Sequence, residues 1–99
     1  MDLHRLGEKR SIAYHRALAA RLDTAMIARA VERLATHPPH PALARAWMEL
    51  LALSPTALAT KLVEDSESMA QLRSASPFAG ELAPRERWEI WRAVREATT

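Results

Sequence analysis

The chain has 99 residues, a formal net charge of +2, 26% charged residues and 48% hydrophobic residues. These values are typical of one globular domain and argue against a disordered segment. The chain has no cysteine, so disulfides and cysteine-ligated metal centres are excluded. Alanine is abundant, there are two glycines, and no run of β-branched residues indicates a strand. We therefore predict an all-α protein, a single compact domain of five to six short helices in a bundle over residues 1–99.

The first helix is predicted over residues 6–22, where apolar side chains recur one helical turn apart. Gly7 weakens the start of this helix, so residues 1–7 form either a flexible arm or its first turn. His15, next to Tyr14, is expected to be either a partly buried histidine or a contact for a partner.

The second helix is predicted over residues 25–35, with Asp23 or Thr24 as its cap. Its apolar residues follow the most regular amphipathic pattern in the chain. Residues 36–41, with three prolines among the last four, must end this helix. We interpret them as a stiff connector to the next helix.

Residues 41–63 predict a helical hairpin, which we take as the organising element of the chain. Its joint is well marked, since Ser54 is a favourable N-cap and Pro55 suits the first position of a helix. Trp47 lies on the apolar face of the first helix of this pair.

A short fifth helix is predicted over residues 67–74, because Ser68 and Gln71 match a capping box. A loop rich in serine, alanine and glycine follows it, and we expect Phe78 to fix this loop to the core. Pro84 then starts the last helix, which is rich in arginine and glutamate.

The apolar positions that recur at helical spacing, together with the single phenylalanine, define the predicted core. Its members are Tyr14, Leu18, Ile27, Val31, Leu34, Leu43, Trp47, Leu50, Leu58, Leu62, Phe78, Trp88 and Trp91.

The sequence has no compact catalytic or cofactor motif: it contains no phosphate-binding loop, dinucleotide fingerprint or nucleophile elbow. His37 and His40 flank two prolines without further ligands nearby, and His4 with Glu8 is more simply an exposed pair. The acidic segment 64–67 fits a solvated helix boundary. We therefore expect no enzymatic activity, no cofactor and no metal site.

Residues 50–62 resemble the helix-turn-helix of DNA-binding regulators. In such a motif Thr56, Thr60 and Lys61 would face the DNA groove. The second helix carries only one cation, however, and runs into Glu64, although phosphate contacts dominate DNA affinity. DNA binding is therefore the alternative function, and nucleic acid is not the expected partner.

Residues 73–80 (RSASPFAG) and 84–88 (PRERW) resemble the C-terminal signature of small bacterial helical proteins of uncharacterised function that are similar to antitoxins. This resemblance implies a protein partner, such as a toxin encoded nearby, and no catalysis. It identifies no functional residue.

The expected function is a non-enzymatic interaction module, an antitoxin-like or regulatory subunit. Basic residues gather in the N-terminal segment and in the last helix, and arginine is enriched at interface hot spots. The binding surface would face an acidic partner or a second copy of the chain in a homodimer. The predicted partner-binding residues are Arg10, Arg16, Arg21, Arg87 and Arg92. No apolar run is long enough to span a membrane, and we expect a cytoplasmic protein.

Overall fold

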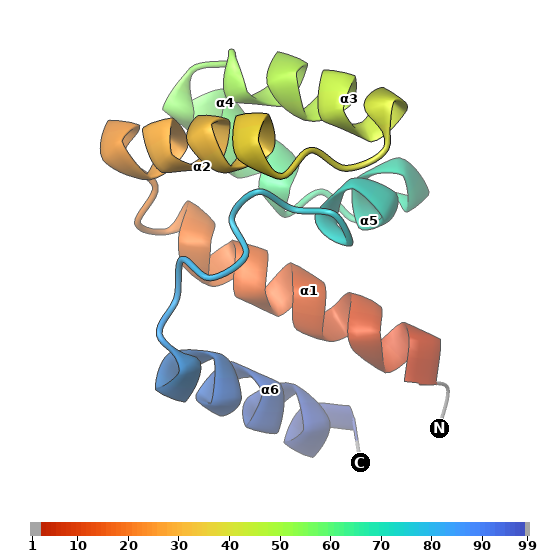
Figure 1. Ribbon diagram of the computed structural model, residues 1–99. Coiled ribbons are helices and arrows are strands. Elements are labelled where there is room, and N and C mark those ends of the chain that lie inside the picture. Colours follow the sequence, from red (N-terminus) through yellow and green to blue (C-terminus); the bar gives the residue numbers. More distant parts are fainter. Residues whose placement is uncertain (1–2, 99) are drawn as a thin grey trace.

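The computed structural model describes residues 3–98, with side chains described for residues 5–97. This part of the chain forms six α-helices and no strand, as predicted for an all-α domain. The helices are α1 (Leu3–Ala19), α2 (Thr24–Thr36), α3 (Pro41–Leu51), α4 (Pro55–Leu62), α5 (Glu67–Arg73) and α6 (Pro84–Thr98). Figure 1 shows α2, α3 and α4 together at one end, α1 with α5 beneath them, and α6 at the opposite end. No helix within residues 3–98 is both long and apolar enough to cross a bilayer.

Helix α1 is the organising element, rather than the predicted 41–63 hairpin, because α4, α5 and α6 all pack against it (Figure 1). It begins before the predicted residue 6, so residues 3–7 form its first turn, and residues 1–2 lie outside the described chain. It also ends earlier than predicted. The Arg21 N–H donates to the Leu18 carbonyl at 3.0 Å, which tightens the last turn before the next helix is capped.

Helices α2 and α4 begin at the caps that the sequence indicated. The Asp23 carboxylate accepts a hydrogen bond from the Met26 N–H at 2.8 Å. The Ser54 hydroxyl accepts from the Ala57 N–H at 3.2 Å, and Pro55 occupies the first position of α4. Local capping therefore explains where both helices start.

The predicted capping box of α5 is wrong. Ser66, not Ser68, is the N-cap: its backbone is extended and its hydroxyl accepts from the Met69 N–H at 3.2 Å. Ser68 lies inside the helix and is exposed. Only Ser68 stands three residues before a Gln, whereas Ser66 stands three residues before Met69, so the capping-box pattern pointed to the wrong serine.

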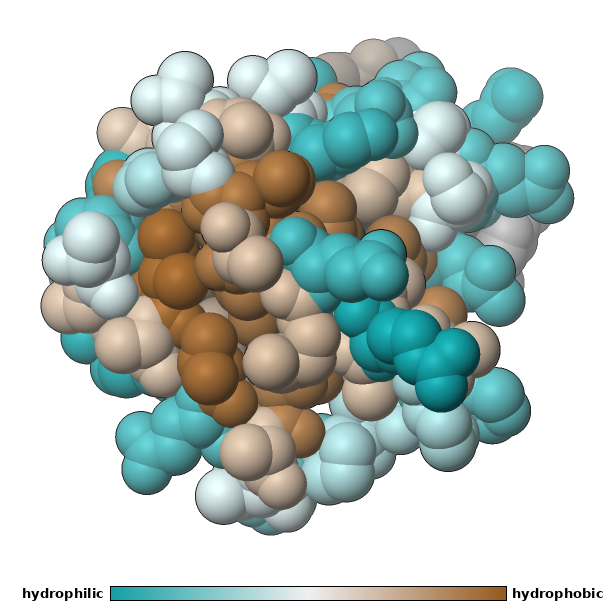
Figure 2. Space-filling view, turned by 90° about the horizontal axis from the view of Figure 1, so that it is seen from above, coloured by the Kyte–Doolittle hydropathy of each residue, from teal (hydrophilic) through white to brown (hydrophobic). Residues whose placement is uncertain are grey.

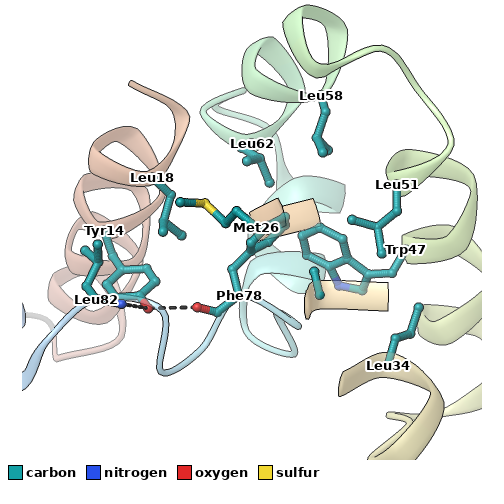
Figure 3. Packing of buried hydrophobic residues seen from close by; sticks show 11 residues of the cluster. Tyr14, Leu18, Met26, Leu34, Trp47, Leu51, Leu58, Leu62, Phe78 and Leu82 are labelled. Atoms are coloured by element: carbon teal, nitrogen blue, oxygen red, sulfur yellow. Dashed lines mark hydrogen bonds between the residues drawn. The ribbon is translucent and has the colours of Figure 1, made fainter. Parts of the chain in front are cut away.

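The core lies between α1 and the upper helices, and Trp47 and Phe78 are its largest fully buried side chains (Figure 3). Their rings meet edge to face at 6.1 Å, and the Trp47 indole N–H donates to the Leu72 carbonyl at 2.9 Å. The buried cluster consists of Tyr14, Leu18, Met26, Ala30, Leu34, Trp47, Leu51, Leu58, Leu62, Phe78 and Leu82.

The loop of residues 74–83 connects α5 to α6 and is fixed by one tyrosine at its middle and near its end. The Tyr14 hydroxyl donates to the Phe78 carbonyl at 2.8 Å and accepts from the Leu82 N–H at 3.4 Å (Figure 3). The Glu81 carboxylate binds Arg29 and Arg33 of α2, with the Arg33 contact at 2.7 Å. The prediction that Phe78 fixes this loop to the core is confirmed.

Three predicted core residues are exposed: Val31, Trp88 and Trp91. Their helical spacing placed them correctly on an apolar face, but the described chain covers these side chains only in part; Arg10 of α1, for example, lies over the Trp91 ring. Ile27, Leu43 and Leu50 are only half-buried. Core positions that the prediction missed include Leu6, Met26, Ala30, Leu51, Met69 and Leu82.

Candidate functional site

A pocket of about 410 Å³ opens where α1, the end of α5, the 74–83 loop and α6 come together. Three arginines from three different helices line it: Arg10 from α1, Arg73 from α5 and Arg87 from α6. We call this the arginine pocket.

The three arginines share an unusual feature: the Nε–H of each is buried and has no hydrogen-bond acceptor within the described chain. Buried polar groups in proteins are normally hydrogen-bonded, so three exceptions in one pocket call for an explanation. Arg73 is otherwise anchored, because its Nη1 donates to the carbonyls of Leu62 at 3.2 Å and Glu64 at 2.8 Å. The guanidinium of Arg10 lies over the Trp91 ring at 5.7 Å.

The lining of the arginine pocket contains no carboxylate. Burial lowers the pKa of Arg73, while the charges of Asp65, Glu8 and Glu64 raise it. Arginine nevertheless remains protonated in proteins, so the pocket presents three positive charges. The hydroxyls of Ser11 and Ser76 line it as well.

His15 and Ser76 form a hydrogen-bonded pair at the wall of the pocket. His15 is buried, and its Nδ1 must donate to the Ser11 carbonyl at 2.7 Å because a carbonyl can only accept. Nε2 therefore accepts from the Ser76 hydroxyl at 2.8 Å. Burial, with a smaller contribution from the Arg73 charge, lowers the pKa of His15 from 6.5 to about 4. The imidazole is thus neutral near pH 7.

The His15–Ser76 pair has the hydrogen bond that a nucleophile and its base require. A base with a pKa near 4 is, however, poorly matched to proton abstraction at neutral pH. The Ser76 hydroxyl also accepts from the Phe78 N–H at 3.1 Å, which fixes the loop that carries Phe78 into the core. The pair thus joins the 74–83 loop to α1.

Trp88 and Trp91 lie three residues apart and share one face of α6, next to the arginine pocket that Trp91 lines. Trp88 is 54% exposed and Trp91 is 38% exposed. The main packing partner of α6 is α1, and Figure 1 shows the outer side of α6 uncovered. An aromatic surface therefore borders a cationic pocket.

The structure brings two of the predicted partner-binding residues together, since Arg10 and Arg87 both line the arginine pocket. Arg16 is exposed and borders a shallow groove lined largely by alanines between α1 and α6. Arg21, in the turn after α1, forms an ion pair with Glu86 and so joins this turn to the start of α6. Arg92 is exposed on α6.

The predicted DNA-contacting residues Thr56, Thr60 and Lys61 are all exposed on α4. The Thr60 hydroxyl donates to the Thr56 carbonyl at 3.2 Å. Lys61 forms an ion pair with Glu64 at 3.2 Å, and this contact helps to lower the pKa of Glu64. The single cation of α4 is therefore already paired within the chain.

No group of three His, Cys, Asp or Glu side chains that could hold a metal ion occurs in the described part of the chain. The His40 side chain accepts from the Ala42 N–H at 3.2 Å and caps α3. His37 is exposed at the end of α2, with its Nδ1 3.1 Å from the Thr36 hydroxyl. The side chain of His4, one helical turn before Glu8, lies outside the described residues.

A second apolar area lies at the far end of the molecule. Figure 2 looks onto the α2, α3 and α4 end and shows hydrophobic side chains gathered there among polar ones. The exposed large hydrophobic residues of this end are Val31, Met48 and Leu53.

Sequence reasoning missed Arg73 and Ser76 as members of a site, because they meet the residues of α1 only in the folded chain. One signal was present: Gly7, Arg10 and Ser11 share one face of α1. In the folded chain both glycines line the pocket as well, and Gly80 has a φ of +86°, which favours glycine. No protein-family model, curated protein or solved structure matches this chain.

Proposed function

We propose that this protein binds another protein through the face of α6 that carries Trp88 and Trp91, as an antitoxin-like or regulatory subunit without catalysis of its own. The observation that carries the proposal is the exposure of these two indoles, 54% and 38%. Tryptophan is the residue type most enriched at interface hot spots, and exposed apolar surface marks interaction sites. A second protein that covered both indoles would bury apolar surface that is exposed to water in the single chain, and this burial would stabilise the complex.

The proposed partner presents an acidic, partly apolar surface. Positive charge adjoins the tryptophans: Arg10 and Arg87 lie in the pocket beside them, and Arg92 is exposed on the same helix. Complementary charge favours such a partner and rejects a basic one. A toxin encoded nearby is one candidate, since residues 73–80 and 84–88 resemble antitoxin-like proteins. The cysteine-free composition suits the reducing cytoplasm, where we place the complex.

The test is to co-express the tagged protein with the products of neighbouring genes and to measure the affinity of any stoichiometric complex by calorimetry. Trp88→Ala should weaken that affinity about 30-fold or more, as expected when a hot-spot tryptophan is removed. The matched control is Met48→Ala, because Met48 is 51% exposed on α3 at the other end of the molecule. This control should bind like the unmodified chain.

A double change of Arg87 and Arg92 to Glu should also abolish the complex, because it reverses the charge next to the tryptophans. The proposal is wrong if Met48→Ala weakens the complex while Trp88→Ala does not, since the partner then binds the α2–α4 end. It is also wrong if the protein binds only its own copy, or stays partnerless and turns over a substrate.

DNA binding through α4 is the second candidate, favoured by the exposure of Thr56, Thr60 and Lys61 on one short helix. The ion pair between Lys61 and Glu64 weakens it, because a paired cation has less to offer a phosphate. Fluorescence anisotropy against the protein's own promoter region at low salt tests it. Binding that falls steeply with salt and with Lys61→Glu would support this function, and no binding would reject it.

A further inference from the structure

We propose that the arginine pocket is a binding site for a small phosphate monoester, held by Arg10, Arg73 and Arg87. This inference goes beyond the proposed protein partner, because it concerns the interior of the pocket and is tested on the purified protein alone, although Arg10, Arg87 and Trp91 belong to both surfaces.

The first argument is hydrogen bonding. Arg10, Arg73 and Arg87 each have a buried Nε–H without an acceptor in the described chain, and all three line one pocket. A buried donor without a partner is unfavourable, so a ligand with several acceptor oxygens in the pocket favours a small rotation of each arginine that brings its Nε–H to one of them. A terminal phosphate offers three such oxygens, and arginine binds phosphate with a geometry that lysine cannot reproduce.

The second argument is charge. The pocket lining contains three guanidinium groups and no carboxylate, so nothing within the lining neutralises them. The acidic residues that raise the pKa of Arg73 (Glu8, Glu64 and Asp65) belong to the surroundings and not to the lining. A phosphate monoester carries close to two negative charges at neutral pH and balances this excess better than a single carboxylate does.

The third argument is the shape and composition of the pocket beyond the arginines. Its volume of about 410 Å³ lies in the range of small-molecule sites and exceeds what a bare phosphate needs. Trp91 and Tyr14 contribute aromatic surface to the lining, and Ser11 and Ser76 contribute hydroxyls. The ligand is therefore an organic molecule whose apolar part lies against Trp91 while its phosphate meets the arginines.

Phenyl phosphate is the probe, because it combines one phosphate with one aromatic ring. Calorimetry should show one site per chain, and the Nε–H resonances of Arg10, Arg73 and Arg87 should shift in a two-dimensional NMR titration. Arg10→Met and Arg87→Met should each weaken binding at least tenfold, since methionine keeps the length of the chain but removes the donor and the charge.

Arg45→Met is the matched control. Arg45 is exposed on α3 and does not line the pocket, so its loss removes the same charge and should change the affinity less than twofold. Arg73 is unsuitable for substitution, because its Nη1 also holds the turn after α4 through the Leu62 and Glu64 carbonyls. Without ligand, both pocket variants should stay folded and melt close to the temperature of the unmodified protein: each loses a buried unpaired donor and a like charge, while Arg10→Met also loses the contact with the Trp91 ring. The melting temperatures therefore show whether a variant binds weakly because it lacks the arginine or because it has unfolded.

Three results would overturn the proposal. The first is no binding of phenyl phosphate at millimolar concentration. The second is equal binding by the unmodified protein and by Arg10→Met and Arg87→Met. The third is benzoate binding as tightly as phenyl phosphate, which would show that the pocket does not select a doubly charged phosphate.

Discussion

The charge state of His15 depends on its burial, and this makes the stability of the protein sensitive to pH. Its pKa is about 4 in the folded chain and 6.5 for an unperturbed histidine, so the unfolded state binds the proton more tightly. The stabilisation is complete above pH 6.5, declines as the pH falls from 6.5 towards 4, and is lost below that. Between pH 7.5 and pH 5 the free energy of unfolding should decrease by about 2 kcal/mol.

Urea unfolding at the two pH values measures this change, and His15→Gln is the control because glutamine does not titrate. The variant should be less stable at pH 7.5, since it loses the hydrogen bonds to Ser11 and Ser76. Its stability should change little down to pH 5. If the free energy of unfolding falls equally in the variant and in the unmodified protein between these pH values, titrating groups other than His15 cause the change.

Two tryptophans of the chain differ sharply in their expected contribution to stability. Trp47 is fully buried and donates to the Leu72 carbonyl, so Trp47→Ala should cost about 3–5 kcal/mol. Trp88 is 54% exposed, so Trp88→Ala should change the free energy of unfolding by about 1 kcal/mol or less. Equal losses in chemical denaturation would contradict the placement of Trp88 on the surface.

At the scale of the single helix, the start of α5 offers a direct test of capping. Ser66→Ala should cost about 1 kcal/mol, because the Met69 N–H loses its acceptor. Ser68→Ala should stay within about 0.5 kcal/mol, since Ser68 is an exposed residue within the helix. Thermal melts of the two variants show which serine caps α5. A larger loss of stability for Ser68→Ala than for Ser66→Ala would support the capping box predicted from the sequence.

Helix positions were predictable from the sequence because their determinants are local. Asp23, Ser54 and Pro84 mark helix starts through interactions within one turn, and these predictions were confirmed. Periodicity also identified the apolar face of α6, but it could not show whether another helix covers that face. Trp88 and Trp91 have the spacing of core residues and are nevertheless exposed.

At the scale of the whole molecule, the solvent accessibility of the tryptophans shows whether the purified protein is a monomer or a homodimer. Acrylamide should quench Trp88 and Trp91 strongly and Trp47 hardly at all, because 54%, 38% and 0% of these residues are exposed. Changing both Trp88 and Trp91 to Phe should leave a weak response from Trp47. Shielding of all three tryptophans in the purified protein would indicate a homodimer that covers the α6 face.

The arginine pocket could not be predicted from the sequence because its residues are distant along the chain. Arg10, Arg73 and Arg87 come from three helices, and the histidine and serine at its wall are separated by 61 residues. Arg10 and Arg87 were predicted to bind a partner because of their residue type and because they lie in basic segments of the chain. Their common position in one pocket follows only from the packing of α5 and α6 on either side of α1 (Figure 1).

The position of α6 at the edge of the fold has a consequence for local unfolding. Every residue of the buried cluster lies at or before Leu82, so the core is complete without α6, and Ile90 only packs against its margin. Such peripheral elements open with a smaller free energy than the whole domain. Arg87 and Trp91 form one wall of the arginine pocket, and this wall therefore moves with α6 when that helix opens. A ligand that bridges Arg87 to Arg10 and Arg73 would couple that opening to the occupancy of the pocket, so α6 amides would exchange with solvent more slowly in the bound protein.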